Sequence, residues 1–231
     1  MTSRGGAHAL VTGASSGIGA AVTARLLREG WRVTGLDRAP PRADFMANPA
    51  FAPITDDLLD TAGIPDALGT LEVTALVHAA GFMRGGTLGD LDAFAGDELW
   101  RVNIAAASML ANTLVPRMTA GGRVVLIGSR QATGVAGRSQ YAAVKAALVA
   151  LARSWAAEVV TKGITVNVVA PGATNTPMLV DPARRTPPPK PPPIGRLIQP
   201  EEVAASVCFL LSPESAPITG HQLVMCGGAS L

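Results

Sequence analysis

The stretch that decides the fold is Thr12-Gly13-Ala14-Ser15-Ser16-Gly17-Ile18-Gly19, a glycine-rich turn that follows the apolar run Ala7–Val11. A helical pattern begins directly after it, because Ile18, Val22 and Leu26 repeat at the spacing of one helix face. Glycines permit positive φ angles and a close approach of the backbone to a ligand. The free N–H groups and the dipole of a helix N-terminus attract an anion, so this strand–turn–helix unit predicts a pyrophosphate site.

Outward from this turn, short apolar runs alternate with alanine-rich helical segments. The runs are continuous rather than alternating, which is typical of parallel strands covered on both faces. Helices are expected over Tyr141–Val160 and Glu201–Leu211. The expected strands are Ala7–Val11, Arg32–Leu36, Ala75–His78, Arg123–Ile127, Thr165–Val169 and Leu223–Met225. This order predicts an α/β fold with a three-layer, doubly wound parallel sheet (Rossmann fold), in a single domain over residues 1–231.

Two proline-rich segments interrupt this order. The prolines of Ala39–Asp57 argue against a full helix there. Asp181–Ile194 holds two runs of consecutive prolines around Lys190, so neither a helix nor an inner strand is expected. We expect a substrate loop at about residues 178–195, acting either as a lid or as a plain connector.

Composition excludes several classes of function. The 231 residues suit one large α/β domain, and no apolar run approaches the ~20 residues of a membrane span. The first apolar stretch is too short for a secretory signal, so a cytoplasmic protein with no membrane partner is expected. A net charge of +2 with dispersed arginines gives no support to nucleic-acid binding. The two cysteines and three histidines lack metal-ligand spacing, and no metal site is expected.

Asp37 ends the second expected strand, a little over twenty residues after the turn. An acidic residue there meets the ribose 2′-OH of the adenosine, and its charge repels the 2′-phosphate of NADP. Arg38 weakens this preference, but Ser15 and Ser16 leave no basic residue in the turn itself. The sequence therefore favours NAD over NADP.

With these features the chain resembles the short-chain dehydrogenase/reductase family over almost its whole length. The resemblance is carried by the TGxxxGIG turn, Asp57-Leu58, Val102-Asn103, Ser129, Tyr141-x-x-x-Lys145, Pro171-Gly172 with Thr176, Ile218-Thr219-Gly220 and Gly227-Gly228. It implies that the cofactor contacts Gly13, Ser15, Ser16, Gly17, Ile18, Gly19, Asp37, Asp57, Leu58, Ala80, Gly81, Tyr141, Lys145, Pro171, Gly172, Thr174 and Thr176. It also implies a homotetramer.

Three features depart from the family pattern. The usual Asn-Asn-Ala-Gly after the fourth strand reads His78-Ala79-Ala80-Gly81, which removes an asparagine that braces the sheet and leaves His78 as a core residue. Ser129 precedes Tyr141 by twelve positions, where thirteen is usual. The proline-rich segment replaces the family's often helical substrate lid.

Tyr141 and Lys145 carry the expected chemistry. Tyr141 is the only tyrosine, lysine is rare in the chain, and a spacing of four places both side chains on one helix face. A phenol titrates near pH ~10, but an ammonium ~4 Å away at an effective dielectric of ~20 contributes about 4 kcal/mol, which lowers the pKa by about three. Tyr141 is therefore expected to act as general acid and base.

The resemblance implies supporting roles for other residues. Lys145 also holds the nicotinamide ribose, Ser129 hydrogen-bonds the substrate oxygen, and Asn103 positions a water of a proton relay. Pro171–Thr176 wraps the nicotinamide carboxamide. Arg130, Gln131, Val135, Arg138 and the segment after Thr176 are candidates for the substrate lining. The two arginines indicate either an anionic substrate or solvated loop residues.

These features predict an NAD-dependent oxidoreductase that interconverts a secondary alcohol (an alcohol, polyol, cyclic diol or sugar) and its ketone. An NAD(P)H-dependent carbonyl or 3-oxoacyl thioester reductase is the alternative. A catalytically silent nucleotide-binding scaffold is an alternative of another class.

Overall fold

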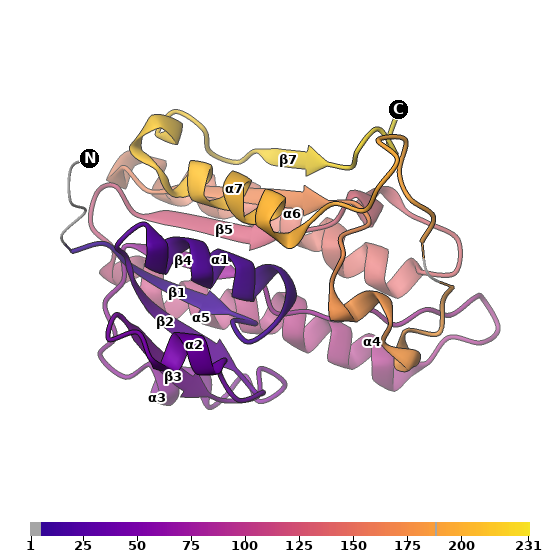
Figure 1. Cartoon of the computed structure of the whole chain (residues 1–231), viewed down its shortest axis with the longest axis horizontal. Coiled ribbons are helices and arrows are strands. Elements are labelled where there is room, and N and C mark those ends of the chain that lie inside the picture. The colour runs from indigo at the N-terminus through magenta and orange to yellow at the C-terminus, as the bar shows by residue number, and fades with distance from the viewer. Residues whose placement is uncertain (1–5, 188) are drawn as a thin grey trace.

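Seven strands form one parallel sheet within residues 6–187 and 189–231, the part of the chain that this computed structural model describes. The strands are β1 (His8–Thr12), β2 (Arg32–Asp37), β3 (Phe51–Thr55), β4 (Ala75–His78), β5 (Arg123–Ile127), β6 (Thr165–Pro171) and β7 (Gln222–Met225). They are ordered β3-β2-β1-β4-β5-β6-β7 (Figure 1). The predicted doubly wound sheet is confirmed, and its order reverses between β1 and β4, where such sheets bind ligands.

Helices cover both faces of this sheet. They are α1 (Gly17–Arg28), α2 (Ala43–Met46), α3 (Ile64–Leu68), α4 (Ala93–Trp100), α5 (Ala106–Leu114), α6 (Ser139–Val159) and α7 (Pro200–Leu211). A π-helical turn, Arg101–Ala105, joins α4 to α5. The expected start of α7 is confirmed: Pro200 occupies its first turn, and the Glu202 carboxylate accepts a hydrogen bond from the Gln199 N–H at 2.8 Å. None of the described helices has the length and apolar character that crossing a membrane requires.

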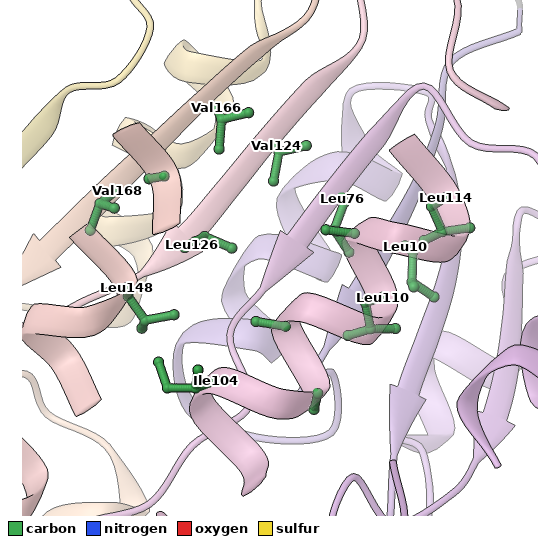
Figure 2. Packing of buried hydrophobic residues seen from close by; sticks show 14 of the residues in the cluster. Leu10, Leu76, Ile104, Leu110, Leu114, Val124, Leu126, Leu148, Val166 and Val168 are labelled. Carbon is green, nitrogen blue, oxygen red and sulfur yellow. The ribbon is translucent and has the colours of Figure 1, made fainter. Parts of the chain in front are cut away.

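The strand side chains divide the core into two layers. On β4, Leu76 belongs to the layer under α5 and α6, whereas Ala75 and Val77 belong to the layer under α1 and α7. In Figure 2, Leu110 of α5 and Leu148 of α6 pack toward the apolar side chains of the strands. Because alternate residues point to opposite faces, only strands that are apolar throughout can fill both layers. The continuous apolar runs of the sequence have this physical cause.

The sequence did not predict β3, because Pro53 lies in its middle. Pro53 pairs with Gly35 of β2, and β3 is the edge strand on that side of the sheet. Proline has no N–H to donate, and an edge strand needs ladder bonds on one side only. The neighbouring α2 is a single turn, in line with the expectation that no full helix forms between residues 39 and 57.

Part of the second proline-rich segment, Asp181–Ile194, has regular structure that the sequence did not predict. Pro182–Arg184 forms a 3-10 turn, because the Asp181 carboxylate accepts a hydrogen bond from the Ala183 N–H at 2.9 Å and caps it. The expectation of no helix is wrong for these three residues. Between 185 and 194 the described residues are neither helix nor strand, and Pro188 lies outside the described residues.

Candidate active site

A cavity of about 950 Å³ opens at the carboxyl ends of the parallel strands. It brings together residues from the glycine turn, from the ends of β2, β4, β5 and β6, and from α6. The predicted site residues that line it are Gly13, Ser16, Gly17, Ile18, Gly19, Asp37, Asp57, Leu58, Ala80, Gly81, Ser129, Tyr141, Lys145, Pro171, Gly172, Thr174 and Thr176. Ser15 and Asn103 do not line it.

The glycine turn is shaped for a phosphate group. Gly13 has a φ of +67°, and a Cβ on it would lie 2.9 Å from the Ala80 backbone. A Cβ on Gly19 would collide with the Gly13 carbonyl oxygen. No side chain caps the first turn of α1, which leaves its N–H groups directed at the cavity for an anion. The turn therefore fits the pyrophosphate of a dinucleotide.

Asp37 is held in place at the end of β2. Its carboxylate accepts hydrogen bonds from the N–H groups of Ser15 and Ala39, both at 2.9 Å. The Ser15 hydroxyl donates to the Ala39 carbonyl at 3.1 Å, which explains why Ser15 supports the loop instead of lining the cavity. Arg38 is exposed, 3.7 Å from an Asp57 carboxylate oxygen. Asp37 is thus a fixed negative charge at the expected ribose position.

Tyr141 lies at the first turn of α6 with its side chain almost fully buried. Ser129 lines the cavity together with Tyr141, although the connecting loop is one residue shorter than usual. Burial raises the pKa of Tyr141, and the Ser129 hydroxyl and the charges of Arg184 and Arg138 oppose this rise. The predicted lowering of this pKa by Lys145 is not borne out, because loss of water around the phenol is the largest effect and raises the pKa.

Lys145 is buried one helical turn after Tyr141. Its Nζ donates to the Ile127 carbonyl at 2.8 Å and lies 5.8 Å from the centre of the Tyr141 ring. Burial lowers the pKa of Lys145 to about 7. The ammonium is therefore tied to the end of β5, with its charge poised to change near neutral pH.

Asn103 lies behind the cavity wall, fully buried in the π-helical turn. Its Nδ2 donates to the Leu99 carbonyl at 2.9 Å, and its Oδ1 has no hydrogen-bond partner among the described residues. A Cβ on Gly81 would stand 3.2 Å from this Oδ1 and 3.5 Å from Lys145 Nζ. The glycine therefore leaves a small polar space between Asn103 and Lys145, which suits the predicted relay.

His78 forms a buried hydrogen-bond network at the end of β4. Its Nε2 donates to the Val102 carbonyl at 3.0 Å, and its Nδ1 lies 3.0 Å from the Thr12 hydroxyl, from which it accepts when the ring is neutral. Thr12 Oγ1 in turn accepts from the N–H groups of Ala79 and Ala80. Burial, and then the charge of Lys145, lower the pKa of His78 to about 3. His78 is thus a satisfied core residue that ties β4 to the turn holding Asn103.

The substrate end of the cavity contains residues that the sequence motifs missed. Arg130, Gln131, Val135 and Arg138 line it as expected. Met83, Arg84, Met178, Asp181, Arg184 and Lys190 line it as well. These residues lie in the segments that follow β4 and β6, where no local sequence pattern marks them as part of a site. For Arg184, the one indication was the expectation that the segment after Thr176 contributes to the substrate lining.

Three comparisons with known proteins agree with this geometry. The family model described as Enoyl-(Acyl carrier protein) reductase matches residues 13–230. The 3-oxoacyl-(acyl-carrier-protein) reductase of Vibrio cholerae is 34% identical over 96% of this chain and 97% of the relative. A short chain dehydrogenase from Burkholderia cenocepacia, solved in complex with NADP, superposes with a TM-score of 0.87 at 32% identity, over 98% of each chain.

The aldohexose dehydrogenase of Thermoplasma acidophilum superposes with the same TM-score of 0.87, at 26% identity over 97% of this chain and 94% of that one. The cofactor turn, the Tyr141–Lys145 pair and these matches over nearly the full length lead to one assignment. The chain is a nicotinamide-dependent oxidoreductase of the short-chain dehydrogenase/reductase family.

Proposed function

We propose that this chain reduces a ketone to a secondary alcohol, and catalyses the reverse oxidation, with Tyr141 as general acid and base. The observation that carries this proposal is the buried Tyr141 side chain, which lines the cavity together with Ser129 and Lys145. Because burial raises its pKa, the phenol is protonated at neutral pH, the form that donates a proton to a carbonyl oxygen. The names of the curated relatives also favour a reductase over the alcohol, polyol or sugar dehydrogenase that the sequence favoured.

Each step uses a group of this chain at a stated atom. Ser129 Oγ and Tyr141 Oη hold the substrate carbonyl oxygen, and the carbonyl carbon accepts a hydride. The Tyr141 hydroxyl gives its proton to that oxygen, and the phenolate that forms is stabilised by Lys145 and reprotonated through the space beside Asn103. When bound, the reduced nicotinamide supplies the hydride. Oxidation of the alcohol reverses the transfers, with Tyr141 taking the hydroxyl proton.

We propose NAD(H) as the preferred cofactor, held by the glycine turn, Asp37, Asp57-Leu58, Lys145 and the loop Pro171–Thr176. The fixed carboxylate of Asp37 supports this choice, since a 2′-phosphate beside it meets a like charge. The NADP bound by the Burkholderia relative and the exposed Arg38 argue the other way.

The test measures the consumption of NADH and NADPH by the purified protein with a panel of ketones, oxo acids, oxo esters and 3-oxoacyl thioesters. We expect turnover, with kcat/KM at least about tenfold higher for NADH. Asp37→Asn keeps the shape of the side chain and removes its charge, so it should shift the ratio toward NADPH by about tenfold. Asp44→Asn, at an exposed aspartate paired with Arg42 outside the cavity, is the matched control. Wild-type turnover with NADPH alone would contradict the cofactor assignment.

The buried set of Ser129, Tyr141 and Lys145 argues against a silent scaffold, since nucleotide binding alone requires no proton relay. Two further expectations remain proposals: a cytoplasmic location, and the homotetramer that the resemblance implies. Phe94 and Trp100 support an assembly, because both are large apolar side chains exposed on α4.

A further inference from the structure

The substrate end of the cavity carries more positive than negative charge. The described cations that line it are Arg84, Arg130, Arg138, Arg184 and Lys190, and the described carboxylates are Glu98 and Asp181. Asp181 pairs with Arg84 at 2.9 Å, so this carboxylate is already neutralised. Glu98 lies on the exposed side of α4. Among the described residues, the remaining arginines of this lining, Arg130, Arg138 and Arg184, form no ion pair.

Arg184 is the most unusual of these residues, because only 3% of its surface is exposed. Its Nε donates to the Thr186 hydroxyl at 2.8 Å, while its Nη1 is buried without a hydrogen-bond partner among the described residues. The Arg184 carbonyl accepts from the Gly85 N–H at 2.9 Å, which fixes the backbone of the 3-10 turn against the cavity wall. A buried guanidinium is costly unless an anion pairs with it.

The charge of Arg184 reaches two neighbours. It opposes the rise in the pKa of the Tyr141 phenol, and burial followed by the charge of Arg138 lowers the pKa of Arg184 itself. Burial and the charge of Arg130 in turn lower the pKa of Arg138. Arg138 and Arg184 thus line the same cavity as Tyr141, and the charge of Arg138 disfavours the charge of Arg184. An anion between them would satisfy the buried Nη1 and remove this repulsion.

We infer that this pocket binds a carboxylate carried by the molecule whose carbonyl is reduced, so that the substrate is a small oxo acid and the product a hydroxy acid. The inference rests on the proposed function and names its substrate class. The forked guanidinium donors match the two oxygens of a carboxylate. A 3-oxoacyl thioester has no charged group next to the carbonyl that is reduced. Its nearest phosphate lies at the far end of the pantetheine arm, away from the reacting carbon. It would leave Arg184 and Arg138 unpaired.

The test compares 2-oxo-, 3-oxo- and 4-oxopentanoate with their methyl esters and with the 3-oxopentanoyl thioester of N-acetylcysteamine, using the preferred cofactor. At least one acid should be turned over with a kcat/KM about 30-fold or more above that of its ester. Arg184→Met and Arg138→Met should each lower the kcat/KM of that acid by about 10- to 30-fold, mainly through KM. The ester, which lacks the carboxylate, should lose less, so that the ratio of the two kcat/KM values falls by about tenfold.

Arg123→Met is the matched control, because Arg123 is also a buried arginine with an unpartnered Nε but stands at the opposite end of β5. It should leave the acid-to-ester ratio unchanged. Arg138 is only half-buried, so its variant gives the readout even if Arg184→Met fails to fold. An equal loss for acid and ester in both arginine variants would mean that these residues act on the pKa of Tyr141 alone, and would overturn the inference.

Two further outcomes separate this inference from the proposed function. Turnover of esters or thioesters in preference to every acid overturns the carboxylate site and leaves the reductase standing. If no compound is turned over, calorimetry on the complex with reduced cofactor still tests the site with pentanoate, an unreactive carboxylate, against neutral pentanamide. Pentanoate binding that both arginine variants lose supports the site, and equal binding of the two compounds overturns it.

Discussion

His78 shows how one buried side chain replaces a missing asparagine. The Val102 carbonyl accepts only, so Nε2 carries the proton and Nδ1 accepts from the Thr12 hydroxyl. A second proton on Nδ1 would face a hydroxyl that already accepts two N–H groups. The network therefore requires a neutral ring, in agreement with the lowering of the His78 pKa to about 3.

This requirement predicts a pH dependence of stability. In the unfolded chain His78 titrates at its ordinary pKa of 6.5, so the unfolded state binds the proton first and protonation favours unfolding. Below pH 6.5 and down to about 3, His78 should lower the free energy of unfolding by about 1.4 kcal/mol per pH unit. Urea denaturation of the wild type and His78→Asn between pH ~7 and ~4.5 measures this. Parallel pH slopes in the two proteins would mean that His78 is charged in the fold.

The sequence predicted the residues that motifs mark and missed those that only the fold brings together. Tyr141 and Lys145 share a helix, so their spacing alone placed both on one face. Arg184 reaches the same centre from an irregular segment more than forty residues away in the chain, and no local pattern records that approach. The pKa of Tyr141 was equally hidden, because it depends on how much water the surrounding elements exclude.

At the scale of elements, the strand–turn–helix unit from β1 to α1 depends on how closely the turn packs on itself. Gly19→Ala would place a methyl group against the Gly13 carbonyl, and the turn must open to admit it. We expect a loss of about 1–3 kcal/mol in unfolding free energy and a roughly tenfold weaker binding of NADH. Thermal unfolding and fluorescence titration measure the two effects.

Gly63→Ala is the control for this substitution. Gly63 precedes α3 with a φ of −75°, and a Cβ there would meet its nearest atom at 3.6 Å. The variant should bind NADH as the wild type does. Unchanged cofactor binding by Gly19→Ala would contradict the role assigned to the turn.

The strands and helices that the sequence predicted are those whose burial leaves a pattern in the chain. The five inner strands were visible as continuous apolar runs, because inner parallel strands bury both faces. β7, at the other edge of the sheet, was predicted from its short apolar run Leu223–Met225. The edge strand β3 buries little, and its Pro53 hides it. The π-helical turn at Arg101–Ala105 has no signature in its residues, yet it holds Asn103 and presents the Val102 carbonyl to His78.

The whole molecule gathers its chemistry at one edge of the sheet. Residues at the carboxyl ends of five strands line the cavity: β1, β2, β4, β5 and β6. The arrows of these parallel strands point the same way in Figure 1. The cavity is divided by charge: Asp37, Asp56 and Asp57 line the nucleotide end, and the arginines line the substrate end. Tyr141 stands between the two, where a hydride donor and a carbonyl would meet.

This arrangement makes Tyr141 essential for turnover and dispensable for cofactor binding. The most direct test is the steady-state turnover of Tyr141→Phe with the preferred cofactor and the best ketone substrate, together with its affinity for NADH. Ser139→Ala, on the exposed side of the same helix end, is the control. We predict that kcat falls by about 10²- to 10⁴-fold while NADH binds with nearly unchanged affinity. Turnover by Tyr141→Phe at the wild-type rate would contradict the account.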